Sequence, residues 1–75
     1  MLEMRLNMAT VTELREKKGW TQRQLADQAG VSYLTVNRIE NKHPVGRIYI
    51  ARVCNALGAD IDAVNGLVFL ERKGK

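Results

Sequence analysis

The stretch LADQAGVSYLTVNRI, from Leu25 to Ile39, decides the fold of this chain. Gly30 interrupts an otherwise continuous amphipathic run, and glycine adopts the left-handed conformation that ends a helix without a steric penalty. Ser32 follows as a good N-cap, because its hydroxyl can accept a hydrogen bond from an amide of the next turn. The stretch therefore predicts two short helices that meet at a tight corner.

Further helix signals lie on the N-terminal side of this corner. Thr21 and Gln24 have the spacing of a capping box, in which each side chain bonds the backbone amide of the other residue, so a helix should begin after Thr21. Upstream, apolar residues three positions apart predict a helix from about residue 10 to 18, and Gly19 marks its end.

Two more helices are predicted on the C-terminal side. Asp60 is a candidate N-cap for a short fifth helix that runs through Ile61 to about Leu67, with Asn65-Gly66 as its terminator. Before it, a helix closed by Gly58 has an apolar stripe at i, i+3, i+4 and i+7, which consists of Ile50, Val53, Cys54 and Leu57.

The two ends of the chain have a different pattern. The apolar residues of LEMRLNM, Leu2 to Met8, alternate with polar ones as in a half-buried strand, and the C-terminal segment GLVFLERKGK begins with an apolar, β-prone run. Short strands could pair these ends, within one chain or across two. Alternatively the N-terminal residues are frayed, as the ends of small domains commonly are. The sequence leaves both interpretations open.

We therefore expect an all-α fold, a compact domain of five helices, to which short terminal strands are an open addition. The domain should span residues 10–66, with its two-helix corner at about 21–41. Residues 1–9 would form an N-terminal extension, and residues 67–75 an apolar segment followed by a basic tail.

Composition narrows the class of protein. Of the 75 residues, 45% are apolar and 27% charged, which suits one ordered domain with a single core. A formal charge of +4 favours a polyanionic partner, either nucleic acid or an anionic membrane surface. One cysteine and one histidine exclude an internal disulfide and are too few for a usual zinc site. No apolar window is long enough to cross a bilayer or suits a signal peptide, so we expect a cytoplasmic protein.

The second helix of the corner, expected over residues 33–41, has two distinct faces. Val36 and Ile39 share the face toward the core. The opposite face carries side chains at i, i+3, i+4 and i+7, namely Leu34, Asn37, Arg38 and Asn41. This helix therefore presents an outward stripe that the fold itself does not need.

The segment LREKKGWTQRQLADQAGVSYLTVNRIEN, Leu14 to Asn41, resembles the helix-turn-helix core of the phage-repressor and Cro family, also called XRE-type. The resemblance extends from about Val11 to Leu67. It implies a five-helix, lambda-repressor-like DNA-binding domain whose second corner helix lies in the major groove. It also implies that Arg15 and Glu40 form a buried ion pair, whereas Trp20 is expected to be a packing anchor.

By position, the resemblance places the DNA-binding residues of the family on this chain. Base reading falls on Tyr33, Leu34, Asn37 and Arg38, with Ser32 near the phosphates and Gln22 at the start of the first corner helix, while Asn41 and Lys42 can add phosphate contacts. Arg38 can bond guanine bidentately, Asn37 can do the same at adenine, and Leu34 can contact a thymine methyl. Tyr33 is equally consistent with half-buried packing.

These features predict a sequence-specific DNA-binding transcriptional regulator, a repressor that acts as a homodimer on a two-fold operator in double-stranded DNA. The dimer surface is expected on apolar residues beyond the last helix: Val64, Leu67, Val68, Phe69 and Leu70. The alternative is a protein-interaction module, such as an antitoxin-type protein, whose contact surface centres on Leu34 and Tyr33. No enzyme, cofactor, metal or small-molecule ligand is expected, because no set of residues assembles a nucleophile, base and oxyanion site.

Overall fold

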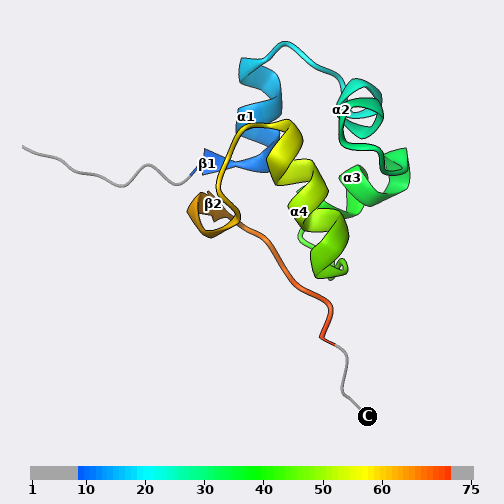
Figure 1. The fold of residues 1–75 in the computed structure, drawn as a ribbon, viewed down its shortest axis with the longest axis vertical. Helices are drawn as coiled ribbons and strands as arrows, with labels where there is room; N and C mark the ends of the chain where they lie inside the picture. Colours follow the sequence, from blue (N-terminus) through cyan, green and yellow to red (C-terminus); the bar gives the residue numbers. More distant parts are fainter. Residues whose placement is uncertain (1–8, 72–75) are drawn as a thin grey trace, which may run out of the picture.

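The structure is a computed structural model and describes residues 9–71. Figure 1 shows a small helical body, with the N- and C-terminal parts of the described chain meeting at a two-stranded sheet. In chain order the elements are β1 (Ala9–Thr10), α1 (Val11–Lys17), α2 (Gln22–Ala29), α3 (Tyr33–Glu40), α4 (Arg47–Ala56), a 3-10 helix (Ile61–Ala63) and β2 (Val64–Asn65).

The two corner helices, α2 and α3, each begin at a residue whose side chain caps the helix. Thr21 accepts a hydrogen bond from the Gln24 amide at 3.1 Å, and the Gln24 side chain accepts one from the Thr21 amide at 2.8 Å. At the start of α3, the Ser32 hydroxyl accepts a hydrogen bond from the Thr35 amide at 3.1 Å. The predicted capping box and the predicted Ser32 N-cap are both confirmed.

Gly30 ends α2 in the left-handed conformation, with φ 71° and ψ 34°. Its amide still donates to the Ala26 carbonyl at 2.9 Å, and the Val31 amide donates to the same oxygen at 3.1 Å. These two bonds turn the chain sharply into α3. The corner predicted at Gly30 is therefore confirmed, and it fixes the angle between the two helices.

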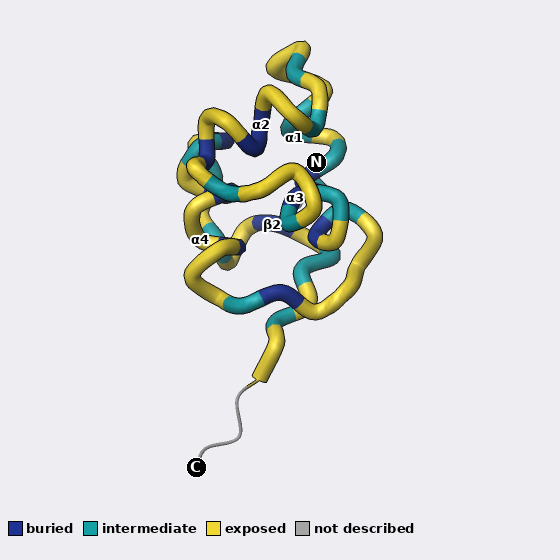
Figure 2. The backbone as a smooth tube through the Cα atoms, turned by 90° about the vertical axis from the view of Figure 1, so that its right-hand side faces the viewer, coloured by how far each residue is buried: buried dark blue, intermediate teal, exposed yellow. Residues whose placement is uncertain are grey.

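The core lies where α2, α3 and α4 pack against one another. Leu25, Val36 and Val53 are completely buried there, and Cys54 from α4 packs beside them. Trp20 packs against the edge of this cluster, as the sequence predicts. In Figure 2 the buried positions appear as short dark-blue stretches that alternate with exposed ones along the chain.

The prediction of a fifth α-helix is wrong: the described residues contain four α-helices. After Asp60 the chain makes a 3-10 helix of three residues and then becomes extended at Val64, with φ −106° and ψ 131°. The Asp60 side chain makes no capping hydrogen bond. Val64 instead pairs with Ala9 in parallel and is buried, so strand pairing takes the place of the expected helix.

The strand pairs in the structure involve other segments than the two chain ends that the sequence suggests. β1 and β2 are the paired strands, whereas the alternating run Leu2 to Met8 lies outside the described residues. The apolar C-terminal run pairs with the loop before α4: Val45 and Phe69 form a parallel bridge. The Val45 amide donates to the Val68 carbonyl at 3.0 Å, and the Leu70 amide donates to the Val45 carbonyl at 2.9 Å.

This pairing also corrects the reasoning behind the expected dimer surface. Val64 is buried, and Leu67 and Phe69 pack against the core of their own chain, so these three residues do find burial after the last helix. Val68 and Leu70 remain exposed. In the described part of the chain, none of the helices is long and apolar enough to cross a membrane.

Candidate nucleic-acid interface

α3 divides its side chains sharply between the core and the surface. Val36 and Ile39 are buried, whereas 53% of Leu34 is exposed and Arg38 is also exposed. Within residues 9–71, no hydrogen bond or ion pair holds the Arg38 guanidinium. A bulky apolar residue and an unengaged cation therefore sit one turn apart on the outward face.

Tyr33, the first residue of α3, is held by a neighbour from α2. The Arg23 guanidinium lies 4.7 Å from the centre of the Tyr33 ring, a distance typical of a cation–π contact. Tyr33 nevertheless remains 41% exposed. Its ring is thus fixed in place at the edge of the outward face, with area left for a further contact.

Asn37 is half-buried and lies within a polar network. Its Nδ2 donates to Gln22 Oε1 at 3.3 Å, and its Oδ1 accepts from Asn41 Nδ2 at 3.2 Å. Gln22 in turn donates from Nε2 to Glu40 Oε1 at 2.8 Å. The side chain of Gln22 is therefore engaged at both ends within the chain, and it connects α2 to two positions of α3.

Arg15 and Glu40 form the expected ion pair, and it is largely shielded from solvent. Arg15 Nε lies 2.6 Å from Glu40 Oε2, and the two side chains are 13% and 7% exposed. Arg15 also donates to the Trp20 carbonyl at 2.8 Å, so it ties α1, the α1–α2 turn and α3 together. Burial acts to raise the pKa of Glu40, but hydrogen bonds from Arg15, Gln22 and Thr12 leave that pKa below its ordinary value.

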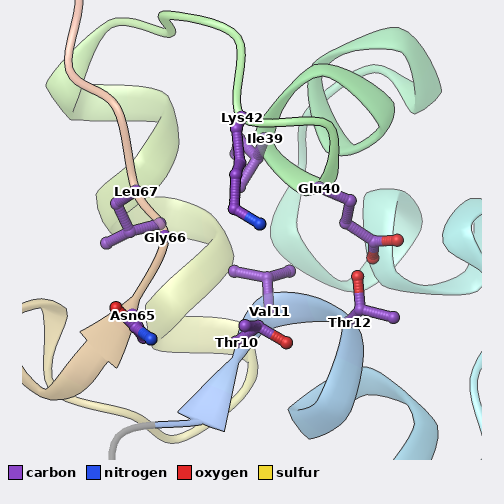
Figure 3. A pocket seen from close by; sticks show the side chains of 9 residues that line it. All are labelled: Thr10, Val11, Thr12, Ile39, Glu40, Lys42, Asn65, Gly66 and Leu67. Atoms are coloured by element: carbon purple, nitrogen blue, oxygen red, sulfur yellow. The ribbon is translucent and has the colours of Figure 1, made fainter.

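The chain leaves α3 through a left-handed residue. Lys42 has φ 62°, and the amides of Lys42 and His43 donate back to the carbonyls of Ile39 and Arg38. The Lys42 side chain turns away from the outward stripe and lines a small cavity of about 70 Å³. Figure 3 shows it extending over Val11, with Glu40 close by. Asn41 stays beside Asn37, since its Nδ2 also donates to the Asn37 carbonyl at 2.9 Å.

Comparison of the amino-acid sequence with known protein families agrees with this geometry. A helix-turn-helix family model matches residues 11–64. The chain belongs to the helix-turn-helix family. It is of the Cro/C1 or XRE type, whose members are DNA-binding regulators. No curated protein and no solved structure matches the chain.

In this helix-turn-helix protein, the structure brings most of the predicted site residues together on one side of α3. Ser32 lies at its N-terminal end, and Tyr33, Leu34 and Arg38 are exposed along it. Asn37 contacts Gln22, and Asn41 contacts Asn37. Lys42 is the exception, because its side chain turns toward the cavity beside β1. Residues 9–71 of the helix-turn-helix protein contain no cluster of three or more potential metal ligands.

Sequence reasoning missed one neighbour of this surface. Leu70 shares an open hollow with Leu34, Arg38 and Pro44, because the bridge between Val45 and Phe69 carries the C-terminal segment past the end of α3. The exposed fraction of Leu70 is 58%. A β-prone run after the last helix was visible in the sequence, but its partner strand was not.

Proposed function

We propose that this protein is a sequence-specific transcriptional repressor that places α3 in the major groove of double-stranded DNA. The observation that supports this most is the outward face of α3, where Leu34 and Arg38 are exposed on a helix whose other face is fixed in the core. A major groove about 12 Å wide accepts one α-helix, and base edges there distinguish all four base pairs.

Each outward side chain has a chemically defined base partner. Arg38 donates two parallel hydrogen bonds to O6 and N7 of guanine, Asn37 bonds the N6 and N7 edge of adenine, and Leu34 contacts a thymine methyl. Tyr33, held under Arg23, contributes at the edge of this surface. A well-formed bidentate pair discriminates against a wrong base by about 1 to 3 kcal/mol.

Phosphate contacts orient the helix without reading sequence. We propose Gln22 and Ser32 for this role because both lie at the N-terminal ends of the two corner helices. Gln22 Nε2 uses one of its two N–H groups on Glu40, and the other is available to a phosphate oxygen. At the other end of α3, Asn41 completes the phosphate set, and Lys42 joins it when its flexible side chain swings out of the cavity beside β1.

We propose a homodimer that forms through the exposed residues of the C-terminal segment, Val68 and Leu70. The bridge with Val45 uses the Val68 carbonyl and the Leu70 amide, so the amide and carbonyl of Phe69 lie at the opposite, open edge of the segment. An open edge with apolar side chains on one face is suited to pairing with a second copy. Because Leu70 adjoins α3, such a pairing would bring two reading helices close together.

The dimer is tested by sedimentation equilibrium of Leu70→Glu. We expect this variant to be monomeric at concentrations where the unchanged protein is dimeric. Ile48→Glu is the matched control, because Ile48 is 60% exposed but lies on α4 outside the segment. Two variants with equal dissociation constants would place the dimer surface elsewhere.

DNA reading is tested by selecting bound duplexes from a random library at two salt concentrations. The proposal predicts an enriched inverted repeat with half-sites about one helical turn, 34 to 36 Å, apart. Repression is then tested by transcription in vitro from a promoter that overlaps the selected sequence, because a protein that only occupies its operator lowers transcription there. No enriched sequence at either salt concentration would overturn the proposal.

A second candidate is a protein-interaction module of antitoxin type on the same surface. It is favoured by the hollow in which Leu34, Pro44 and Leu70 lie together, an apolar grouping beside the reading stripe. Salt separates the two functions. Binding that neutralises Z phosphates loses affinity with a log–log slope of about −0.9Z, whereas an apolar protein contact is nearly insensitive to salt.

A further inference from the structure

A continuous series of side-chain hydrogen bonds joins the buried ion pair to the outward face of α3. It runs from Arg15 to Glu40, then to Gln22, Asn37 and Asn41, with donor–acceptor distances of 2.6, 2.8, 3.3 and 3.2 Å in that order. The series crosses from α1 to α3, from α3 to α2 and back to α3. It ends at residues that lie on the proposed DNA-binding surface.

The charge on Glu40 sets the direction of every later bond. An ionised carboxylate only accepts hydrogen bonds, so Gln22 must turn Nε2 toward it and Oε1 toward Asn37. Asn37 must then present Nδ2 to Gln22, which leaves Oδ1 on the side of the Asn41 donor. A half-turn of either amide would place two acceptors or two donors in contact.

We propose that Glu40 is a positioning residue that acts through Gln22 to fix which end of the Asn37 amide donates and which end accepts. This inference rests on the proposed function, in which Asn37 faces a base edge. A primary amide has two N–H groups and two oxygen lone pairs, so Asn37 retains one of each after its internal bonds. In the major groove adenine offers the N6 amino group as a donor beside N7 as an acceptor. An Asn37 amide held in one orientation has its free oxygen lone pair and its free N–H in a fixed arrangement, so it bonds adenine in a single orientation.

If Glu40 acts in this way, its effect on DNA sequence preference can be measured separately from its effect on the stability of the fold. Removing the negative charge of Glu40 while keeping its shape releases the orientation of Gln22 and therefore of Asn37. Replacing Arg15 with lysine weakens the same ion pair but leaves Glu40 ionised, so the direction of the series is retained. The pair Glu40→Gln and Arg15→Lys thus perturbs the same ion pair in two ways, and only Glu40→Gln removes the charge that orients Gln22 and Asn37.

The test is selection from a random duplex library with four proteins: the unchanged chain, Asn37→Ala, Glu40→Gln and Arg15→Lys. Loss of preference in Asn37→Ala identifies the base pair that Asn37 reads. There we expect Glu40→Gln to lose on the order of tenfold in preference, with the other positions unchanged, as fits one lost bidentate contact. Arg15→Lys should keep the preference at every position.

Equal behaviour of Glu40→Gln and Arg15→Lys at that base pair would overturn the proposal, whether both keep the preference or both lose it. If Glu40→Gln does not fold, Gln22→Met takes its place. Methionine keeps the length of the side chain but has no amide with which to orient Asn37, so the same loss at the same base pair is expected. An unchanged preference in Gln22→Met would contradict the proposal.

A measurement without DNA separates this inference from the proposed function. Nuclear magnetic resonance of the side-chain amides should show slowed solvent exchange of one Gln22 and one Asn37 amide proton, in the unchanged chain and in Arg15→Lys. Fast exchange of both would overturn the hydrogen-bond series itself. Slowed exchange in a chain that selects no DNA sequence would instead overturn the proposed function and, with it, the reading of a base by Asn37.

Discussion

Removal of Arg15 is the perturbation whose cost follows most directly from the structure. In Arg15→Met the Glu40 carboxylate, whose side chain is 7% exposed, loses its cation and two hydrogen bonds of 2.6 and 3.2 Å. Leaving a buried charge uncompensated costs about 3 to 5 kcal/mol. A domain of 75 residues has a total stability of about 4 to 11 kcal/mol at 0.05 to 0.15 kcal/mol per residue, so the loss is a large part of it.

Urea unfolding, followed by the fluorescence of Trp20, measures this loss. With a slope of about 1 kcal/mol per molar urea for a small domain, the midpoint should fall by about 3 to 5 M. Lys17→Met is the matched control, because Lys17 is an exposed cation on the same helix and its loss should cost within about 0.5 kcal/mol.

The double variant Arg15→Met/Glu40→Leu completes the argument. Apolar replacement of both partners of a buried pair is often neutral or stabilising, so this variant should recover most of the stability that Arg15→Met loses. A cost below about 1 kcal/mol for Arg15→Met would refute the reasoning, since that is the value of a solvated surface pair. So would a double variant that is less stable than Arg15→Met alone.

Three further predictions follow from single residues. Arg38→Ala should relax the preference at one base position and cost about 1 to 3 kcal/mol in specific binding. Lys42→Ala should weaken binding to all DNA sequences alike and lower the salt slope by about 1. Equal effects of both variants on specific and random DNA would contradict this assignment. Lys42→Gly should raise the melting temperature by a few degrees, because glycine relieves the positive φ of 62° at that position. Because the pKa of Glu40 is lowered on folding, its stabilising effect is present above the unfolded pKa of about 4.3 and is lost as pH falls through the lower folded pKa. Urea midpoints should accordingly fall in acid for the unchanged chain and fall less for Glu40→Leu; equal slopes would contradict this.

The local features of the fold were predictable because each depends on a few neighbouring residues. The capping box of Thr21 and Gln24, the left-handed turn at Gly30 and the Ser32 cap are all set within four positions of the chain. The Arg15–Glu40 pair spans 25 positions and came from the resemblance, which supplied the packing of α1 against α3. Neither periodicity nor composition could have given that contact.

The features that were missed depend on contacts between distant segments. Asp60 and the apolar residues after it suited a helix locally, but parallel pairing of Val64 with Ala9 prevailed. The C-terminal apolar run is held by the bridge between Phe69 and Val45, and nothing in the sequence of the run itself indicates that partner. The amide contact between Gln22 and Asn37 likewise exists only because α2 and α3 cross at the angle that Gly30 imposes.

The central claim, that α3 reads the major groove, is tested most directly by methylation protection on a selected duplex. Dimethyl sulfate modifies guanine N7 in the major groove and adenine N3 in the minor groove. The account predicts protection of guanine N7 at two sites about one helical turn apart, with one guanine in each half-site exposed again in Arg38→Ala. Protection of adenine N3 alone, or a guanine pattern that Arg38→Ala leaves unchanged, would contradict it.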